Sequence, residues 1–336
     1  GADFINVLFS EFLVYDPKNP KWEGRDRFFL DPGHMSPMLY STLALTGKFT
    51  MDDLQQFRQL GSVTPGHPER DIMRGIENTS GPLGQGHTFA VGAAIAAKFL
   101  KQRFGSCMDQ TIYAFISDGG VQEEISQGAG RTAGHLGLDN LIMFYDSNGI
   151  QLSTKTSEVS EEDVAAKYTA WGRRVITIKG NDVTEIRAAL TEAKLEKEKP
   201  TLIIGKTIMG KGAVKADGSS FEGETETHGQ PLSAAGASFE KTIAGLGGDP
   251  ANAFVIFPEV KELYAKREAE LTEIVSKRYA EKQAWAKANP ELADKMQKWF
   301  GGHLPAINWA GIEQKPNQAT RAASATVLGV LAKEVE

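Results

Sequence analysis

Cysteine is almost absent from this sequence, and it has neither a long apolar run nor a large net charge. Cys107 is the only cysteine, so no internal disulfide can form, which is typical of a reducing, cytoplasmic compartment. No run of about 18 apolar residues occurs, so no segment is predicted to span a membrane. The formal net charge of −6 argues against a general nucleic-acid binder, whose surface must neutralise phosphates.

The two ends of the sequence resemble interrupted elements. Residues 1–9 have the pattern of the inside of an amphipathic helix and not of a signal peptide. Residues 323–336 have the pattern of a helix that is cut short. We therefore expect the chain to be a fragment of a longer polypeptide.

Strand-like and helix-like patterns alternate through the middle of the chain. Short β-rich runs bounded by Gly, Asp, Asn or Pro are separated by helical patterns. This alternation predicts an α/β fold in which a parallel β-sheet carries helices on both faces and binds ligands at the carboxyl ends of its strands. The expected strands are Thr111–Ile116, Asn140–Tyr145, Val175–Ile178 and Leu202–Lys206, and the expected helices cover about 86–103, 122–135, 160–171 and 182–197.

The second half of the chain has less regular patterns. Gly210–Gly229 is rich in Gly, Ser, Thr and acidic residues without periodicity, which predicts a long functional or mobile loop. Residues 258–300 form a long, charged helical pattern, interpreted as a solvated buttress. We predict one domain over 1–304 that ends in this C-terminal helical extension, a linker over 305–316, and the truncated start of another domain over 317–336.

Two polar turns follow consecutive predicted strands. Ser117-Asp118-Gly119 ends the first strand, and Asp146-Ser147-Asn148-Gly149-Ile150 ends the second, with Asn148 thirty residues after Asp118. Either turn alone is ordinary after a strand. Because successive parallel strands end side by side, Asp118 and Asn148 are expected to converge. A carboxylate, an amide oxygen and a backbone carbonyl suit Mg²⁺ shared with a diphosphate, and Gly119 leaves room for the backbone to approach it.

Three histidines lie in predicted loops. His34 follows the hydrophobic run Arg27–Leu30, His67 lies in the turn Thr64–Glu69, and His228 lies in the glycine-rich loop. A lone loop histidine is usually a surface residue, but three beside a diphosphate site suit proton transfer near neutral pH. The remaining histidines are interpreted as structural or surface residues: His87, His135 and His303.

Taken together, these motifs resemble the transketolase family of thiamine diphosphate enzymes. Such enzymes carry Gly-Asp-Gly after one strand and Asn after the next, with Ser117 here in place of the first glycine. Around His34 the family's Ser-Asn-Gly-His-Gly-Ser-Met is replaced by Asp-Pro-Gly-His-Met-Ser-Pro, whereas Thr64–Glu69 and Ser80–Gly86 match without change. The resemblance runs from Asn6 to Ala332.

The resemblance implies roles for individual residues. Asp118, Asn148 and the carbonyl of Ile150 would bind Mg²⁺, with Ca²⁺ or Mn²⁺ able to replace it. Arg321 would hold a substrate phosphate, together with substrate contacts from His67 and His228. The implied catalytic residues are His34, His67, His228 and Glu123. The implied contacts to thiamine diphosphate are His34, Gly81, Pro82, Leu83, Asp118, Gly119, Glu123, Asn148 and His228.

The resemblance also implies an activity and an assembly. A two-carbon ketol unit would pass from a ketose phosphate such as xylulose 5-phosphate to an aldose phosphate such as ribose 5-phosphate, in the pentose phosphate pathway. The enzyme would be a homodimer with its site at the subunit interface. Residues 1–304 would be the diphosphate-binding domain and 317–336 the start of the pyrimidine-binding domain. In the family, the glutamate that activates the cofactor belongs to the second half of the polypeptide, which we expect this fragment to lack. We therefore expect the isolated chain to be nearly inactive.

Other functions remain open at this point. A synthase that joins pyruvate to glyceraldehyde 3-phosphate, or a 2-oxo acid dehydrogenase subunit, would share the Asp118 and Asn148 turns. A homologue that binds the diphosphate without catalysis, or the first subunit of a two-chain transketolase, would also fit part of the pattern. The contexts of the three loop histidines as a set favour transketolase.

Overall fold

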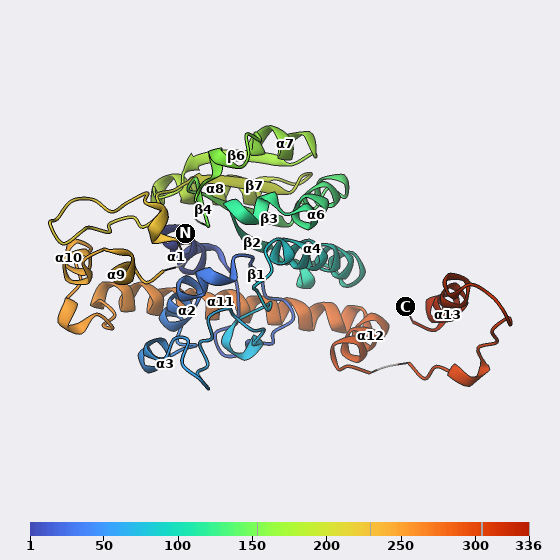
Figure 1. Ribbon diagram of the computed structural model, residues 1–336. Helices are drawn as coiled ribbons and strands as arrows, with labels where there is room; N and C mark the ends of the chain where they lie inside the picture. Colours follow the sequence, from blue (N-terminus) through green and yellow to red (C-terminus); the bar gives the residue numbers. More distant parts are fainter. Residues whose placement is uncertain (153, 229, 304, 336) are drawn as a thin grey trace. The chain divides into compact units, whose positions relative to one another are not determined.

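A parallel sheet of five strands lies at the centre of the first of two units, Gly1–Lys282, in the computed structural model (Figure 1). The strand order is β1-β2-β3-β7-β6, and every neighbouring pair is parallel. A short antiparallel pair, β4 with β5, follows β3 along the chain. The strands are β1 Arg27–Leu30, β2 Ile112–Ser117, β3 Leu141–Ser147, β4 Ile150–Gln151, β5 Thr154–Lys155, β6 Arg174–Lys179 and β7 Thr201–Lys206.

Helices cover both faces of this sheet because successive residues of each strand point to opposite sides. In β2, Tyr113 and Phe115 belong to one apolar core, whereas Ile112 and Ala114 belong to the other. Residues of α1, α2 and α8 complete the first core, and residues of α4, α6 and α7 complete the second. The α/β architecture expected from the sequence is therefore confirmed.

Thirteen α-helices occur in the described part of the chain, together with short 3₁₀ and π segments. They are α1 Ala2–Val7, α2 Ser36–Leu45, α3 Met51–Gln55, α4 Gln85–Phe104, α5 Asp118–Gln122, α6 Glu124–His135, α7 Val164–Ala170, α8 Val183–Leu195, α9 Leu232–Ala235, α10 Phe239–Gly245, α11 Pro258–Ala288, α12 Pro290–Phe300 and α13 Thr320–Glu334.

Several boundaries differ from the sequence-based expectation for local physical reasons. The helix expected over about 122–135 is α6, which begins only at Glu124 because Glu123 is extended (φ −67°, ψ 131°) and Gln122 ends the preceding short helix α5. The helix expected from 160 begins only at Val164, where the Asp163 carboxylate caps it by accepting the Ala166 N–H. The run Arg27–Leu30, which was not among the four expected strands, is the edge strand β1.

The structure describes residues 1–152, 154–228, 230–303 and 305–335. Gly229, Leu304 and Glu336, on which predicted segment boundaries fall, lie outside these residues. The second unit is Gln283–Glu336, and the predicted division at 304 and 316 stays a prediction. Within the described ranges, no helix combines the length and the apolar composition that crossing a membrane requires.

Two glycines of α6 have opposite surroundings and provide a matched test of the packing. A Cβ on Gly134 would overlap the carbonyl oxygen of Trp171, whereas a Cβ on Gly128 would meet no atom of the described residues within 4 Å. We expect Gly134→Ala to lower the free energy of unfolding by about 3 kcal/mol through overpacking. We expect Gly128→Ala to raise it by about 0.5 kcal/mol because alanine is the better helix former. Chemical denaturation measures both changes, and two changes of the same sign would contradict the described packing.

Candidate functional site

The carboxyl ends of the parallel strands surround one cavity of about 1090 Å³. Its lining comes from the segments that follow β1, β2, β3, β6 and β7, because all five strands end at the same edge of the sheet. The sequence predicts ligand binding in the loops after Ile116, Tyr145 and Lys206, and residues of all three loops line the cavity. The cavity is therefore the candidate site.

Most residues singled out by sequence reasoning come together in this cavity. Pro82 belongs to the same loop as Gly81 and Leu83 but does not line the cavity, and Arg321 is an exposed residue of α13 in the second unit. The roles of all these residues stay predictions. The predicted residues that line the cavity are His34, His67, Gly81, Leu83, Asp118, Gly119, Glu123, Asn148, Ile150 and His228.

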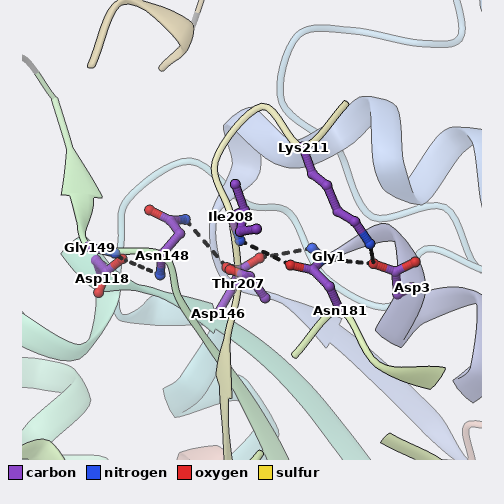
Figure 2. Close-up of polar contacts among 10 residues, drawn as sticks. All are labelled: Gly1, Asp3, Asp118, Asp146, Asn148, Gly149, Asn181, Thr207, Ile208 and Lys211. Carbon is purple, nitrogen blue, oxygen red and sulfur yellow. Dashed lines mark hydrogen bonds and ion pairs between the residues drawn. The ribbon is translucent and has the colours of Figure 1, made fainter. Parts of the chain in front are cut away.

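The carboxylate of Asp118 joins the turns that follow β2 and β3. It accepts hydrogen bonds from the backbone N–H groups of Asn148 and Gly149, both at 3.0 Å (Figure 2), and from the Tyr145 hydroxyl. Gly149 has a φ of +76°, so the turn adopts a conformation that favours glycine. Burial raises the pKa of Asp118 despite these hydrogen bonds, and the neighbouring carboxylate of Asp146 acts in the same direction. The expected convergence of the two turns is thus present.

The groups in this corner fit a hard divalent cation. Asp118 and Asp146 are two neighbouring carboxylates that are only 2% and 3% exposed, an arrangement that a cation would stabilise. The amide oxygen of Asn148 accepts the N–H of Ile150 at 2.9 Å and keeps a second lone pair. No cluster of three His, Cys, Asp or Glu side chains suited to a metal occurs among the described residues. A cation here would therefore also need amide and carbonyl oxygens, which Mg²⁺ and Ca²⁺ accept.

Close backbone contacts bring the loop after β1 against the loop of residues 81–84. A Cβ on Gly33 would lie 2.8 Å from the backbone nitrogen of Gly81, so only glycine permits this approach. Asp31 accepts the N–H of Gly84 at 3.1 Å and that of His87 at 3.4 Å, and so caps α4, whose own N-cap glycine has no side chain. Burial raises the pKa of Asp31 to about 6. Sequence reasoning did not detect this cap, because its partners are more than fifty residues away.

The three loop histidines line the same cavity. The rings of His34 and His228 have centroids 5.2 Å apart. Burial, and to a lesser extent the electrostatic influence of the neighbouring His228, His67 and Arg58 side chains, lowers the pKa of His34 to about 4, so His34 is neutral at pH 7. Burial also lowers the pKa of His228. The buried Nδ1 of His228 has no hydrogen-bond partner within the described residues, so it is available to a ligand in the cavity.

The turn that carries His67 is held by α2. The Ser36 hydroxyl donates to the carbonyl of Gly66 at 2.7 Å, and the Tyr40 hydroxyl donates to the carbonyl of Pro65 at 3.0 Å. A Cβ on Gly81 would lie 3.3 Å from Nδ1 of His67, so the ring lies against the loop of residues 81–84. Hydrogen bonds to the backbone of this turn and the position of the ring beside Gly81 together fix His67.

The other three histidines lie elsewhere. His87 is fully buried, with Nδ1 2.8 Å from the Ser126 hydroxyl and Nε2 3.3 Å from the guanidinium of Arg173. His135 and His303 are exposed. None of the three lines the cavity.

Several polar residues of the cavity were not predicted from the sequence. The Thr207 hydroxyl donates to Asp146, and the N–H of Ile208 donates to the Asn181 side chain at 3.0 Å (Figure 2). The ammonium of Lys211 lies 3.7 Å from the Asp3 carboxylate. The segment after β7 contains Thr207, Ile208 and Lys211. Their position just after a strand end was the one feature of the sequence that could have predicted them as cavity residues.

Comparisons with known proteins give consistent matches. The family model for transketolase, thiamine diphosphate binding domain, matches residues 1–305. Transketolase 1 of Pasteurella multocida is 39% identical over 99% of this chain and 50% of its own length. A transketolase of Geobacillus stearothermophilus is 38% identical over 100% of this chain and 51% of its own.

Solved structures agree with these matches. Transketolase from Leishmania mexicana gives a TM-score of 0.89 at 35% identity and covers 98% of this chain and 49% of its own. A Pichia stipitis transketolase in complex with sedoheptulose 7-phosphate gives 0.88 at 36% identity, with the same coverage. The chain spans about half the length of the relatives it matches. From the family match over nearly the whole chain, the shared fold and the cavity at the strand ends, we conclude that the chain belongs to the transketolase family and contains that family's thiamine diphosphate-binding domain.

Proposed function

We propose that this chain is the diphosphate-binding half of a transketolase. Its reaction moves a two-carbon ketol unit from a ketose phosphate such as xylulose 5-phosphate to an aldose phosphate such as ribose 5-phosphate, in the pentose phosphate pathway. The observation that carries the proposal is the meeting of the Asp118 and Asn148 turns with three loop histidines in one cavity. The names and structures of the relatives support the same activity.

The cation and the diphosphate would bind where β2 and β3 end. Asp118, Asn148 and the backbone carbonyl of Ile150 would hold Mg²⁺, or Ca²⁺ or Mn²⁺ in its place. Gly119 lines the cavity without a side chain, so its backbone can approach the diphosphate. The loop of residues 81–83 and Glu123 would lie along the rest of the cofactor. When bound, thiamine diphosphate supplies the carbanion chemistry that breaks a carbon–carbon bond next to a carbonyl.

The histidines would move protons at the substrate's hydroxyl and carbonyl oxygens. A neutral imidazole both donates and accepts, and the low pKa of His34 keeps it in that form at pH 7. The Nδ1 of His228, which has no partner among the residues that the structure describes, would bind the cofactor diphosphate or a substrate hydroxyl. His67, fixed by its turn, would orient the donor sugar. Arg321 would bind the substrate phosphate as a bidentate donor.

A homodimer with the site at its interface fits the surface beside the cavity. Large apolar side chains on α4 and α6 are exposed, including Phe89 at 47% and Ile125 at 51%. Exposed apolar side chains of this size are common at interfaces. Ile125 lies two residues after Glu123, which lines the cavity, so a second copy that covered Ile125 would lie close to the site. Cys107 is a buried free thiol, which fits the reducing cytoplasm that we propose as its compartment.

Complementation tests the proposed function. The chain, thiamine diphosphate, Mg²⁺, xylulose 5-phosphate and ribose 5-phosphate are combined with and without the pyrimidine-binding half, and sedoheptulose 7-phosphate is measured. We expect product only when both halves are present. Asp118→Ala should lower the rate by more than about 100-fold, because it removes a metal ligand. The exposed Asp52→Ala serves as the control and should leave the rate unchanged. Consumption of pyruvate in place of xylulose 5-phosphate would assign the chain to another thiamine enzyme.

The pKa of His34 predicts a pH dependence of stability. Because this pKa is lowered from 6.5 to about 4, the folded state holds His34 neutral while the unfolded state protonates it. The resulting stability is fully present above pH 6.5 and is lost as the pH falls towards 4. We expect His34→Gln to reduce this acid-side loss in the free energy of unfolding by on the order of 1 kcal/mol. Denaturation between pH 7 and 4 measures it, and the exposed His135→Gln should retain the full loss. If the free energy of unfolding depended on pH equally in the two variants, the lowered pKa of His34 would be contradicted.

A further inference from the structure

Asp146 is a buried carboxylate of the cavity that is not among the proposed cation ligands or proton-transfer groups. It lies in β3, two residues before Asn148, and is 3% exposed. Its Oδ1 accepts the side-chain amide N–H of Asn148 at 3.3 Å and the hydroxyl of Thr207 (Figure 2). Its Oδ2 lies 3.0 Å from the backbone nitrogen of Gly1. Asp146 therefore contacts the nitrogen of the Asn148 side-chain amide, and the oxygen of that amide, the predicted metal ligand, faces away from Asp146.

The hydrogen-bonding capacity of Asp146 decides which end of the Asn148 amide faces it. The two ends of a carboxamide have nearly the same shape, but the nitrogen only donates and the oxygen only accepts. An ionised carboxylate can only accept, so it attracts the amide nitrogen and repels the oxygen. The oxygen is then turned to the other side, where it accepts the N–H of Ile150 at 2.9 Å and retains a free lone pair. An amide nitrogen in that place could not ligate Mg²⁺.

We propose that Asp146 is a positioning residue of the metal site, which orients the Asn148 amide so that its oxygen faces the cation. This rests on the proposed function, because it assumes that a divalent cation binds at Asp118 and Asn148. Asp146 itself need not touch the cation. It acts as the outer partner that fixes a ligand's orientation, as carboxylates do behind metal-binding histidines.

Thr207 completes the arrangement by fixing Asp146. It begins the segment after β7, where its backbone N–H donates to the carbonyl of Ser147 at 3.2 Å and its hydroxyl donates to Oδ1 of Asp146. The next residue, Ile208, is held by the Asn181 side chain. The hydrogen bonds thus connect the metal-binding turn to residues 207–212, which line the cavity. A change at Thr207 should therefore reach the metal site through Asp146.

Metal affinity tests the proposal without measuring turnover. The chain is reconstituted with the pyrimidine-binding half and thiamine diphosphate, and free Mn²⁺ is measured by electron paramagnetic resonance during a titration. We expect Asp146→Asn to raise the Kd for Mn²⁺ by roughly 10- to 100-fold, since asparagine has the same shape but no carboxylate to attract the amide nitrogen, which leaves only the Ile150 N–H to orient the Asn148 amide. Asp16→Asn, at another buried aspartate outside the cavity, should leave the Kd within about twofold of the original value.

A pair of substitutions at Thr207 covers the case in which Asp146→Asn fails to fold. Thr207→Val removes the hydroxyl and keeps the shape, so we expect a Kd about fivefold higher. Thr207→Ser keeps the hydroxyl and should restore the Kd, which loss of packing alone would not do. Thermal unfolding of the metal-free proteins checks that the variants are folded.

The outcomes separate this proposal from the proposed function. If Mn²⁺ binding depends on Asp118 but neither Asp146→Asn nor Thr207→Val weakens it, the proposal is overturned and the metal site stands. If Mn²⁺ binds equally to the original chain and to Asp118→Ala, the proposed metal site fails and the proposal fails with it. Weaker binding in Asp146→Asn and Thr207→Val, with recovery in Thr207→Ser, supports the proposal.

Discussion

The hydrogen bonds between the Asp118 carboxylate and the turn after β3 are the interaction on which the cavity depends. A carboxylate that is 2% exposed is unfavourable unless its oxygens are hydrogen-bonded. The Asn148 and Gly149 amides and the Tyr145 hydroxyl supply these bonds. They can do so because β2 and β3 are parallel neighbours, with Ser117 paired to Asp146 at the strand ends. The same register that forms the sheet therefore places the two turns in contact.

The remaining walls of the cavity are fixed by contacts to the sheet's other strand ends. Gly33 lets the loop after β1 touch the backbone of Gly81, and Asp31 caps α4 from the same loop. α2 holds the turn of His67 through two hydroxyl donors. Thr207 ties the segment after β7 to Asp146. The cavity is thus formed by loops that are anchored individually, and two of those loops carry His34 and His67.

Features encoded by neighbouring residues could be predicted from the sequence. The β-rich runs after Gln110 and Asp139 gave strands within two residues of their observed bounds, and the spacing of Asp118 and Asn148 predicted that they meet. The resemblance of the His34 and His67 loops to the transketolase family supplied roles that no spacing rule provides. β1 was not predicted as a strand, because four residues carry too little alternation to distinguish it from a hydrophobic turn.

Features that depend on distant partners could not be predicted. Asp31 has the appearance of a turn residue before a proline, and its capping of α4 exists only because the fold brings Gly84 and His87 to it. Asp146 is one of several polar residues at the end of β3, and only the position of Thr207 distinguishes it. His87 lies in a helix whose sequence does not show that Ser126 and Arg173 will surround it.

Anomalous diffraction would show whether the converging strand ends form a cation and diphosphate site. Crystals of the chain soaked with Mn²⁺ and thiamine diphosphate are examined at the manganese edge. We expect one strong peak within coordination distance of Asp118, Asn148 and the carbonyl of Ile150, with the diphosphate beside Gly119. A peak elsewhere in the chain, or a diphosphate bound away from the ends of β2 and β3, would contradict it.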